Sequence, residues 1–217
     1  DVARLDNVQV LQYHEVGKVT LDVEAEVDFD VTNFEFDKKH MVVNGTGLTF
    51  GVTKCKNLPD EFFGYMSKDE RATYYVNEKR VTWITCQMAN NTGKSYTTYD
   101  SCYIQFVNLD YEGPLLLNEC SLYEVQLSSK AMKGRILSDD GLSFDIGSGL
   151  TEKSTYEDFV AVLGEPSSDY TYEYEDGSST TKYSFGSTMM QGWSLHVTFL
   201  NGVGICEIDY TGYVYND

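Results

Sequence analysis

The sequence is short of the residues on which most enzymes and nucleic-acid-binding proteins depend. It has three histidines and 16 Lys and Arg residues, against 34 Asp and Glu residues in 217 positions. The net charge of -18 repels phosphate backbones and anionic membranes, whose binding relies on clusters of Lys and Arg. We therefore expect no nucleic-acid partner. Three scattered histidines also offer no evident catalytic base with an orienting partner.

Other familiar signals are missing too. There is no apolar run of about 18 residues, the length that spans a bilayer. The five cysteines have no CxxC spacing, so neither a zinc site nor a complete disulfide framework is predicted. No phosphate loop, dinucleotide fingerprint, GxSxG or HExxH motif stands in a credible context. The sequence predicts a protein that is not an enzyme, with no cofactor and no metal site.

What the chain does contain favours β-strands. It has 17 tyrosines and 41% hydrophobic residues, which is enough for a packed core. Acidic and apolar residues alternate without exception over residues 22–31, the period of a strand with one wet and one buried face. Carboxylates in such a row are too far apart to converge on one Ca²⁺ ion, so we expect a solvated face. A shift of phase at Thr32 and Asn33 predicts a bulge or turn.

The second half of the chain repeats the first. Three pairs of segments match: residues 47–50 with 141–144, 101–108 with 194–201, and 123–128 with 206–211. The first two pairs are offset by 94 and 93 residues and the third by 83, which places about ten extra residues in the first copy near residues 109–118. The predicted organisation has three parts: an acidic N-terminal strand segment (1–40), a first repeat (41–134) and a second repeat (135–217).

Each repeat is expected to be α+β, with a short helical segment packed on an antiparallel sheet of about four strands. In the second repeat a capping box at Ser154 and Glu157, with Gly164 at the far end, predicts the clearest helix. The strands that follow reverse at residues 176–177 and 201–202. In the first repeat we expect a weaker helix near 59–66 and strands near 72–76, 81–88, 102–107 and 121–127. Neither repeat contains a βαβ crossover, which argues against a parallel nucleotide-binding sheet.

Rows of tyrosine are the candidates for a contact surface. Tyr170, Tyr172 and Tyr174 share one face of a predicted strand, and an exposed row of rings can stack on sugars or anchor a protein partner. The favoured competing interpretation is that this row packs under the predicted helix, which needs an apolar sheet face to cover. A second candidate surface lies in the C-terminal tail: Tyr210, Tyr213 and Tyr215.

The cysteines and His196 have structural explanations. His196 occupies a polar-phase position between apolar neighbours, so we expect an exposed strand residue. Cys102 and Cys206 are in phase with apolar core positions, which favours inert buried thiols. A bridge between Cys86 and Cys102 across neighbouring strands stays open as an alternative. Because the number of cysteines is odd, at least one thiol is free or is paired between chains.

Residues 149–166 carry a resemblance to secreted bacterial proteins. A glycine-rich approach leads there into Ser-Thr-Tyr-Glu-Asp-Phe-Val-Ala-Val-Leu-Gly-Glu-Pro. A short helix ending in Leu-Gly-x-Pro, then a tyrosine-rich hairpin and a final strand pair, resembles the unit of β-lactamase inhibitory protein and of small outer-membrane assembly lipoproteins. From about residue 45 onward, including residues 114–125, the chain is similar to duplicated-unit cell-surface lipoproteins of gut Firmicutes.

This resemblance implies an extracellular protein anchored to the outer face of the bacterial cell membrane through a removed N-terminal lipid anchor. A chain that begins at Asp1 rather than Met fits such processing. The resemblance implies no assigned activity. We therefore expect a non-catalytic binding or interaction protein whose ligand is a protein or a glycan at the cell surface. The alternative, which rests on likeness of fold alone, is a proteinaceous inhibitor of an extracellular hydrolase.

Overall fold

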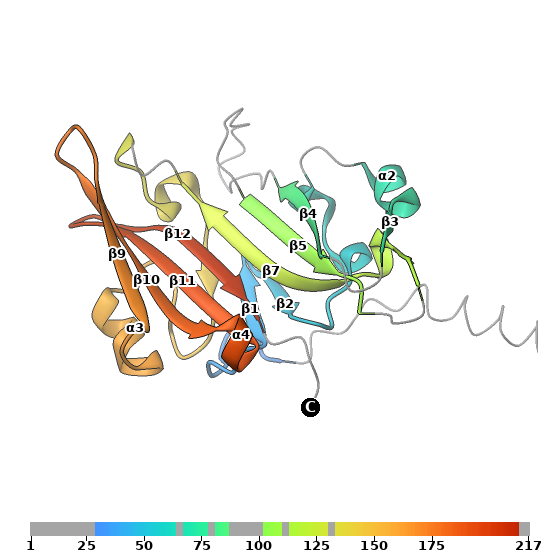
Figure 1. Cartoon of the computed structure of the whole chain (residues 1–217), viewed down its shortest axis with the longest axis horizontal. Coiled ribbons are helices and arrows are strands. Elements are labelled where there is room, and N and C mark those ends of the chain that lie inside the picture. Colours follow the sequence, from blue (N-terminus) through green and yellow to red (C-terminus); the bar gives the residue numbers. More distant parts are fainter. Residues whose placement is uncertain are drawn as a thin grey trace, which may run out of the picture.

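A computed structural model of the chain describes residues 29–63, 67–77, 81–86, 102–109, 113–129 and 133–212. Its main element is a twisted seven-stranded sheet of order β4-β5-β7-β12-β11-β10-β9 (Figure 1). Every neighbouring pair in this sheet is antiparallel. The strands are β4 (Val81–Cys86), β5 (Cys102–Val107), β7 (Ser121–Ser128), β9 (Ser168–Glu173), β10 (Ser179–Ser187), β11 (Trp193–Leu200) and β12 (Gly204–Thr211).

Smaller elements accompany the main sheet. A three-stranded sheet of order β2-β1-β8 is formed by β1 (His40–Val43), β2 (Thr46–Thr49) and β8 (Phe144–Asp145), and β3 (Tyr75–Val76) pairs with β6 (Leu115–Leu116). The α-helices are α2 (Lys68–Thr73), α3 (Tyr156–Leu163) and α4 (Thr188–Gln191). Short 3-10 turns occur at η1 (Cys55–Asn57), η2 (Asp60–Phe62), η3 (Leu117–Glu119) and η5 (Leu137–Asp140). In the described ranges no helix has the length and apolar character needed to cross a membrane.

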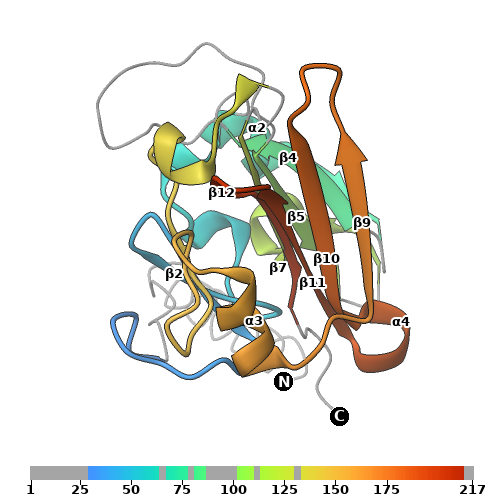
Figure 2. The ribbon, with the colours of Figure 1, turned by 90° about the vertical axis from the view of Figure 1, so that its left-hand side faces the viewer.

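The core lies on one side of the main sheet. Because side chains alternate along a strand, every second residue of β5, β7, β11 and β12 points to this side, and Ile104, Val125, Val197 and Ile208 are completely buried there. Helix α3 covers the same side, with the Phe159 ring 6.2 Å from that of Phe185. Figure 2 shows α3 and β2 together on one side of β10 and β11. We call this covered side the inner face.

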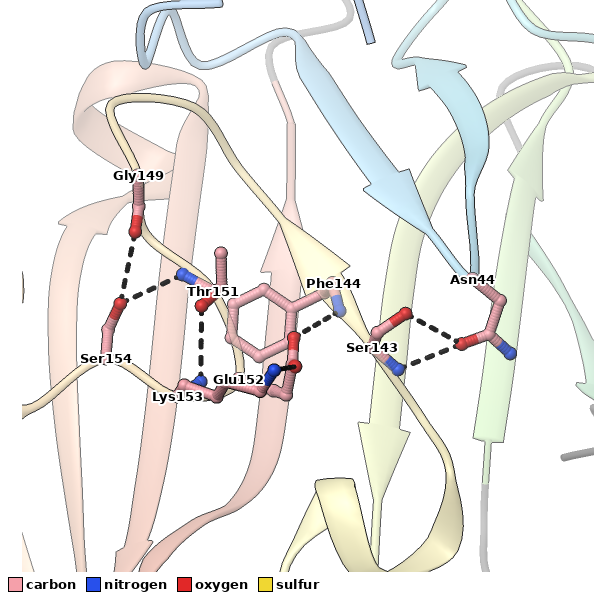
Figure 3. A network of polar contacts seen from close by, with 8 residues as sticks. All are labelled: Asn44, Ser143, Phe144, Gly149, Thr151, Glu152, Lys153 and Ser154. Carbon is pink, nitrogen blue, oxygen red and sulfur yellow. Dashed lines mark hydrogen bonds and ion pairs between the residues drawn. The ribbon is translucent and has the colours of Figure 1, made fainter. Parts of the chain in front are cut away.

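The helix α3 begins one residue later than predicted. Thr155, not Ser154, is its N-cap, and it forms a capping box with Asp158. Ser154 instead closes the preceding turn, since its hydroxyl accepts from the Thr151 N–H at 3.0 Å and donates to the Gly149 carbonyl at 3.3 Å (Figure 3). Both residues fit the Ser/Thr-x-x-Asp/Glu pattern, so the pattern alone did not distinguish them. The end of the helix at Gly164 is confirmed, with φ of 80° there.

Beyond this helix, residues 135–217, the predicted second repeat, follow the predicted order of elements more closely than residues 41–134 do. Its four strands and its reversals are confirmed, and Gly177 and Gly202 adopt the positive φ of 83° and 75° that such turns require. In the first repeat the helix expected near 59–66 is wrong, because η2 occupies part of it and α2 begins only at Lys68. Ser67 is the N-cap of α2 and forms a capping box with Glu70, a pattern that the sequence contains but that was not predicted.

The acidic N-terminal strand falls mostly outside the described residues. The three described residues of its predicted range, 29–31, are not in a strand. The predicted turn that follows is confirmed: the Thr32 N–H donates to Asp30 Oδ1 at 2.9 Å, and the Asn33 N–H donates to the Asp30 carbonyl at 3.1 Å.

Strands from both predicted repeats hydrogen-bond in one sheet, where β7 pairs with β12.

Candidate functional site

The main sheet has a second face, which we call the outer face. Among the described residues, no helix or strand packs over its β9–β12 part, although the short α4 lies at one end (Figures 1 and 2). The strand register aligns its residues in rows: one holds Tyr170, Lys182, Thr198 and Glu207, and the next Ser184, His196, Asp209 and Gln126. Hydrogen-bonding side chains thus dominate the face that the core does not use.

Tyrosines stand at the exposed edge of the outer face. Tyr170 is 68% exposed and Tyr172 is 51% exposed, while Tyr174 is partly buried and its ring lies 4.9 Å from that of Tyr172. Tyr170 pairs with Lys182, on the face opposite to α3, so the interpretation that this row packs under the helix is wrong. Inward-facing Tyr183 takes that position, with its ring 4.3 Å from Tyr156 of α3.

The predicted contact residues near the C-terminus do not form an exposed row in the described part of the chain. Tyr210 is completely buried, so its prediction as a contact residue is wrong. It lies on β12 in phase with Ile208, and its ring is 4.8 Å from that of Phe50. Burial raises the pKa of its hydroxyl well above the ordinary value. Tyr213 and Tyr215 lie outside the described residues.

Two carboxyl groups lie together further across the outer face. Glu124 of β7 accepts from Gln105 Nε2 at 2.6 Å and from Thr211 Oγ1 at 3.2 Å. Burial, reinforced by the nearby Asp209 carboxylate, raises the pKa of Glu124 to about 7. Burial also raises the pKa of Asp209, whose Oδ1 atom is buried and has no hydrogen-bond partner. Near neutral pH the Glu124 carboxyl group can thus either donate or accept a hydrogen bond.

A serine, a histidine and an aspartate stand side by side in the same row. Ser184 Oγ and His196 Nδ1 are 2.9 Å apart, and Asp209 is the register partner of His196 on the next strand. A catalytic triad requires the carboxylate to hold and charge-stabilise the imidazole. Neither His196 nor Asp209 has such a bond in the structure, and burial lowers the pKa of His196. The row therefore resembles a set of hydrogen-bonding groups more than a nucleophile and its base.

The inner side of the molecule has hollows of its own. One of about 520 Å³ lies beyond the end of α3 and includes Phe36, Lys38 and Trp193 in its lining. Lys38 Nζ stands 5.3 Å from the centre of the Trp193 ring, and Trp193 Nε1 is buried without an acceptor. Another, of about 380 Å³, lies between the start of α3 and the β11–β12 turn. Neither is lined by a tyrosine of the predicted contact surface.

The structure also shows where Cys206 and His196 lie relative to the sequence-based predictions. Cys206 is 2% exposed, which confirms its predicted burial, whereas the side chain of Cys102 lies outside the described part. His196 is half-buried rather than freely exposed, although it does lie on the outer face as its phase predicted. In the described ranges no group of three or more His, Cys, Asp or Glu side chains is placed to hold a metal ion.

Glu124 and Asp209 were missed by sequence reasoning. They are far apart in the chain and meet only because β7 pairs with β12, with Gln126 opposite Asp209. The third repeat match aligns residues 123–128 with 206–211 as equivalent segments, but such a match does not predict that the two strands pair. Compared with known proteins, the chain matches no family model, no curated protein and no solved structure.

Proposed function

We propose that this chain is a non-catalytic binding protein of the extracellular surface, and that its ligand docks on the outer face of the main sheet. The observation that carries the proposal is the pair of exposed rings, Tyr170 and Tyr172, beside rows of hydrogen-bonding side chains. Two rigid aromatic rings on a strand offer a large contact area at low entropic cost.

The chemistry of the outer face favours a glycan over an apolar protein surface. Beside Tyr170 stand Lys182, Thr198 and Glu207, and behind them lie the half-buried carboxyl groups of Glu124 and Asp209. Hydroxyl-rich ligands need both donors and acceptors, and the Glu124 carboxyl group, whose pKa is about 7, can act as either. The rings can stack on the less polar faces of sugars while these groups bind the hydroxyls.

The proposal that binding occurs without turnover rests on the geometry of the Ser184–His196 pair. The Ser184 hydroxyl bonds to His196, but no carboxylate orients that imidazole. A nucleophilic serine needs such an orienting partner for its base. A serine-directed fluorophosphonate probe should therefore leave Ser184 unlabelled. Labelling that is lost in Ser184→Ala would overturn the non-catalytic part of the proposal.

We also propose that the chain arose by duplication, with repeats at 41–134 and 135–217, as in the cell-surface lipoproteins that it resembles. The pairing of strands supports this. The matching strands β7 and β12 lie next to each other in the sheet, and the matching strands β5 and β11 flank them on either side. The remaining matched pair, β2 and β8, flanks β1 in the small sheet.

The binding proposal is tested by a glycan array and by capture from cell-wall and culture-fluid fractions, using the purified chain. We expect the wild-type chain to bind a defined glycan, and the double variant Tyr170→Ala/Tyr172→Ala to lose the signal. The matched control is Tyr74→Ala/Tyr75→Ala, which removes two rings that are 47% and 63% exposed elsewhere. Capture of a protein by the same tyrosines would reassign the ligand class. Equal loss of binding in both double variants would remove the outer face as the site.

A further inference from the structure

Two cysteines of the first half face each other in the fold. The chain entering η1 runs antiparallel to the start of β7, with Lys54 and Ser121 as bridge partners. Lys54 Nζ donates to Ser121 Oγ at 2.8 Å, so both of these side chains lie on one side of the bridge. At the next position the Cys55 N–H donates to the Cys120 carbonyl at 3.1 Å. Cys55 and Cys120 are therefore consecutive opposed residues on the other side.

Both thiols of this pair are completely buried, and both are free in the structure. The Cys120 thiol donates to the Leu116 carbonyl at 3.5 Å, a weak bond that rotation about χ1 can exchange for another contact. Directly opposed residues of antiparallel chains have Cα atoms about 4.5–5.5 Å apart. Disulfides span Cα separations of about 4.4–6.8 Å, so the backbone already suits a bridge.

A second pair occurs in the neighbouring hairpin. Cys86, the last residue of β4, and Cys102, the first of β5, are direct register partners. The Cα atoms of such register partners lie about 4.5–5.5 Å apart, within the range that a disulfide spans. The fifth cysteine, Cys206, lies on β12 at the bulge between β11 and β12, where its thiol donates to the Thr198 carbonyl at 3.3 Å. Four of the five cysteines are thus placed in two opposed pairs, and the odd one stands apart.

We propose that the oxidised chain contains two disulfides, Cys55–Cys120 and Cys86–Cys102, and leaves Cys206 as its one free thiol. Each bridge forms by thiol–disulfide exchange with a low-molecular-weight disulfide such as oxidised glutathione. Two S–H bonds are lost and one S–S bond forms, while the two electrons and two protons convert the oxidant to two thiols.

The timing of the exchange follows from burial. In the folded, reduced chain, burial raises the pKa of Cys55 to about 12 and that of Cys120 to about 11. The thiolate is the attacking species and is scarce under those conditions. The bridge therefore forms while the chain folds, before the core closes over the pair, and resists reduction afterwards. Cys55–Cys120 then ties η1 to the start of β7, and Cys86–Cys102 closes the β4–β5 hairpin.

The first experiment maps the bonds in the whole chain after refolding in a glutathione redox buffer. Free thiols are alkylated in denaturant without reduction, and peptides are identified by mass spectrometry. Trypsin leaves Cys102 and Cys120 on one peptide, because no Lys or Arg separates them, so a second cleavage after Glu112 is needed. We expect both linked pairs and alkylation at Cys206 alone. Alkylation of Cys55 and Cys120, or any bridge to Cys206, overturns the proposal.

The second experiment compares the urea unfolding midpoint of the oxidised chain with that of chain that was first reduced in denaturant and then refolded with a reducing agent present. Each bridge restricts the unfolded chain, so reduction should lower the midpoint of the wild type. Cys55→Ala/Cys120→Ala should start lower and respond less to reduction, and Cys86→Ala/Cys102→Ala should respond likewise. Cys206→Ala is the matched control and should keep the full response. A wild-type midpoint that is unchanged by reduction contradicts the bridges without requiring that any variant fold.

Discussion

The two faces of the main sheet are built from the same strands but differ in chemistry. On β10, inward-facing Phe185 is 2% exposed and packs near Phe159 of α3, whereas the next residue outward, Ser184, bonds to His196. The inner face is apolar and covered. The outer face carries tyrosines, a lysine, a histidine and carboxyl groups, and the described residues place no helix or strand over its β9–β12 part.

The inner face holds residues that stabilise the fold, whereas the outer face holds residues that the fold does not need. Ordinary polar residues are sufficient on the exposed face of a sheet. Folding does not require carboxyl groups with a raised pKa there. Burial of Glu124 and Asp209 beside each other costs stability once they ionise. Groups that cost stability and fill no core position are typical of functional sites.

The largest effect expected is on stability, from the inner face. Phe185→Ala removes a buried ring and should lower the free energy of unfolding by about 3–5 kcal/mol. Tyr170→Ala, on the outer face of the neighbouring strand, should change it by no more than about 0.5 kcal/mol. Urea unfolding of both variants measures the contrast. Similar losses in the two variants would mean that the faces are not divided as described.

The next effect concerns ligand affinity, from the outer face. With a glycan identified by array, Tyr170→Ala/Tyr172→Ala should weaken binding by about 2 kcal/mol, roughly thirtyfold in Kd. The stability of this double variant should stay near that of the wild type. Titration calorimetry gives the affinity, with Tyr74→Ala/Tyr75→Ala as the control. A control that loses as much affinity as the test variant contradicts an outer-face site.

Much of the fold was accessible from the sequence, because alternation and turn residues are local signals. The strand pattern around Tyr170 and the reversals at residues 176–177 and 201–202 were predicted for that reason. Alternation shows that two faces exist but not which one a helix covers, so the tyrosine row was assigned to the wrong face. Tyr210 was misjudged although its phase with Ile208 already indicated burial. The proximity of Glu124 and Asp209 depends on the long-range pairing of β7 with β12, which no local pattern reveals.

A smaller effect depends on pH. The ordinary pKa of 4.5 for glutamate applies to Glu124 in the unfolded chain, and its pKa in the folded chain is about 7. The neutral form thus favours folding: its contribution is complete below pH 4.5 and is lost as pH rises through about 7. Glu124→Gln should raise stability at pH 8 by an amount on the order of 1 kcal/mol, allowing for partial exposure, and change little at pH 4. Unfolding midpoints across this range measure the difference. An equal shift of the unfolding midpoint at pH 4 and at pH 8 would contradict the raised pKa of Glu124 as the cause.

The smallest effect tests the independence of the faces. Thr155→Ala removes the N-cap of α3, and helix caps contribute about 1 kcal/mol. Because α3 covers the inner face, the variant should lose that much stability and keep its glycan affinity. Thermal unfolding and calorimetry on one sample give both values. An affinity that falls together with stability would indicate that the ligand contacts the α3 side instead.

The most direct test is hydroxyl-radical footprinting of the wild-type chain with and without its bound glycan, read at individual side chains by mass spectrometry. The account predicts that Tyr170 and Tyr172 become protected, while the exposed Tyr74 and Tyr75 keep their reactivity. Protection of the Tyr74–Tyr75 pair, with Tyr170 and Tyr172 unchanged, would contradict the assignment of the binding site to the outer face.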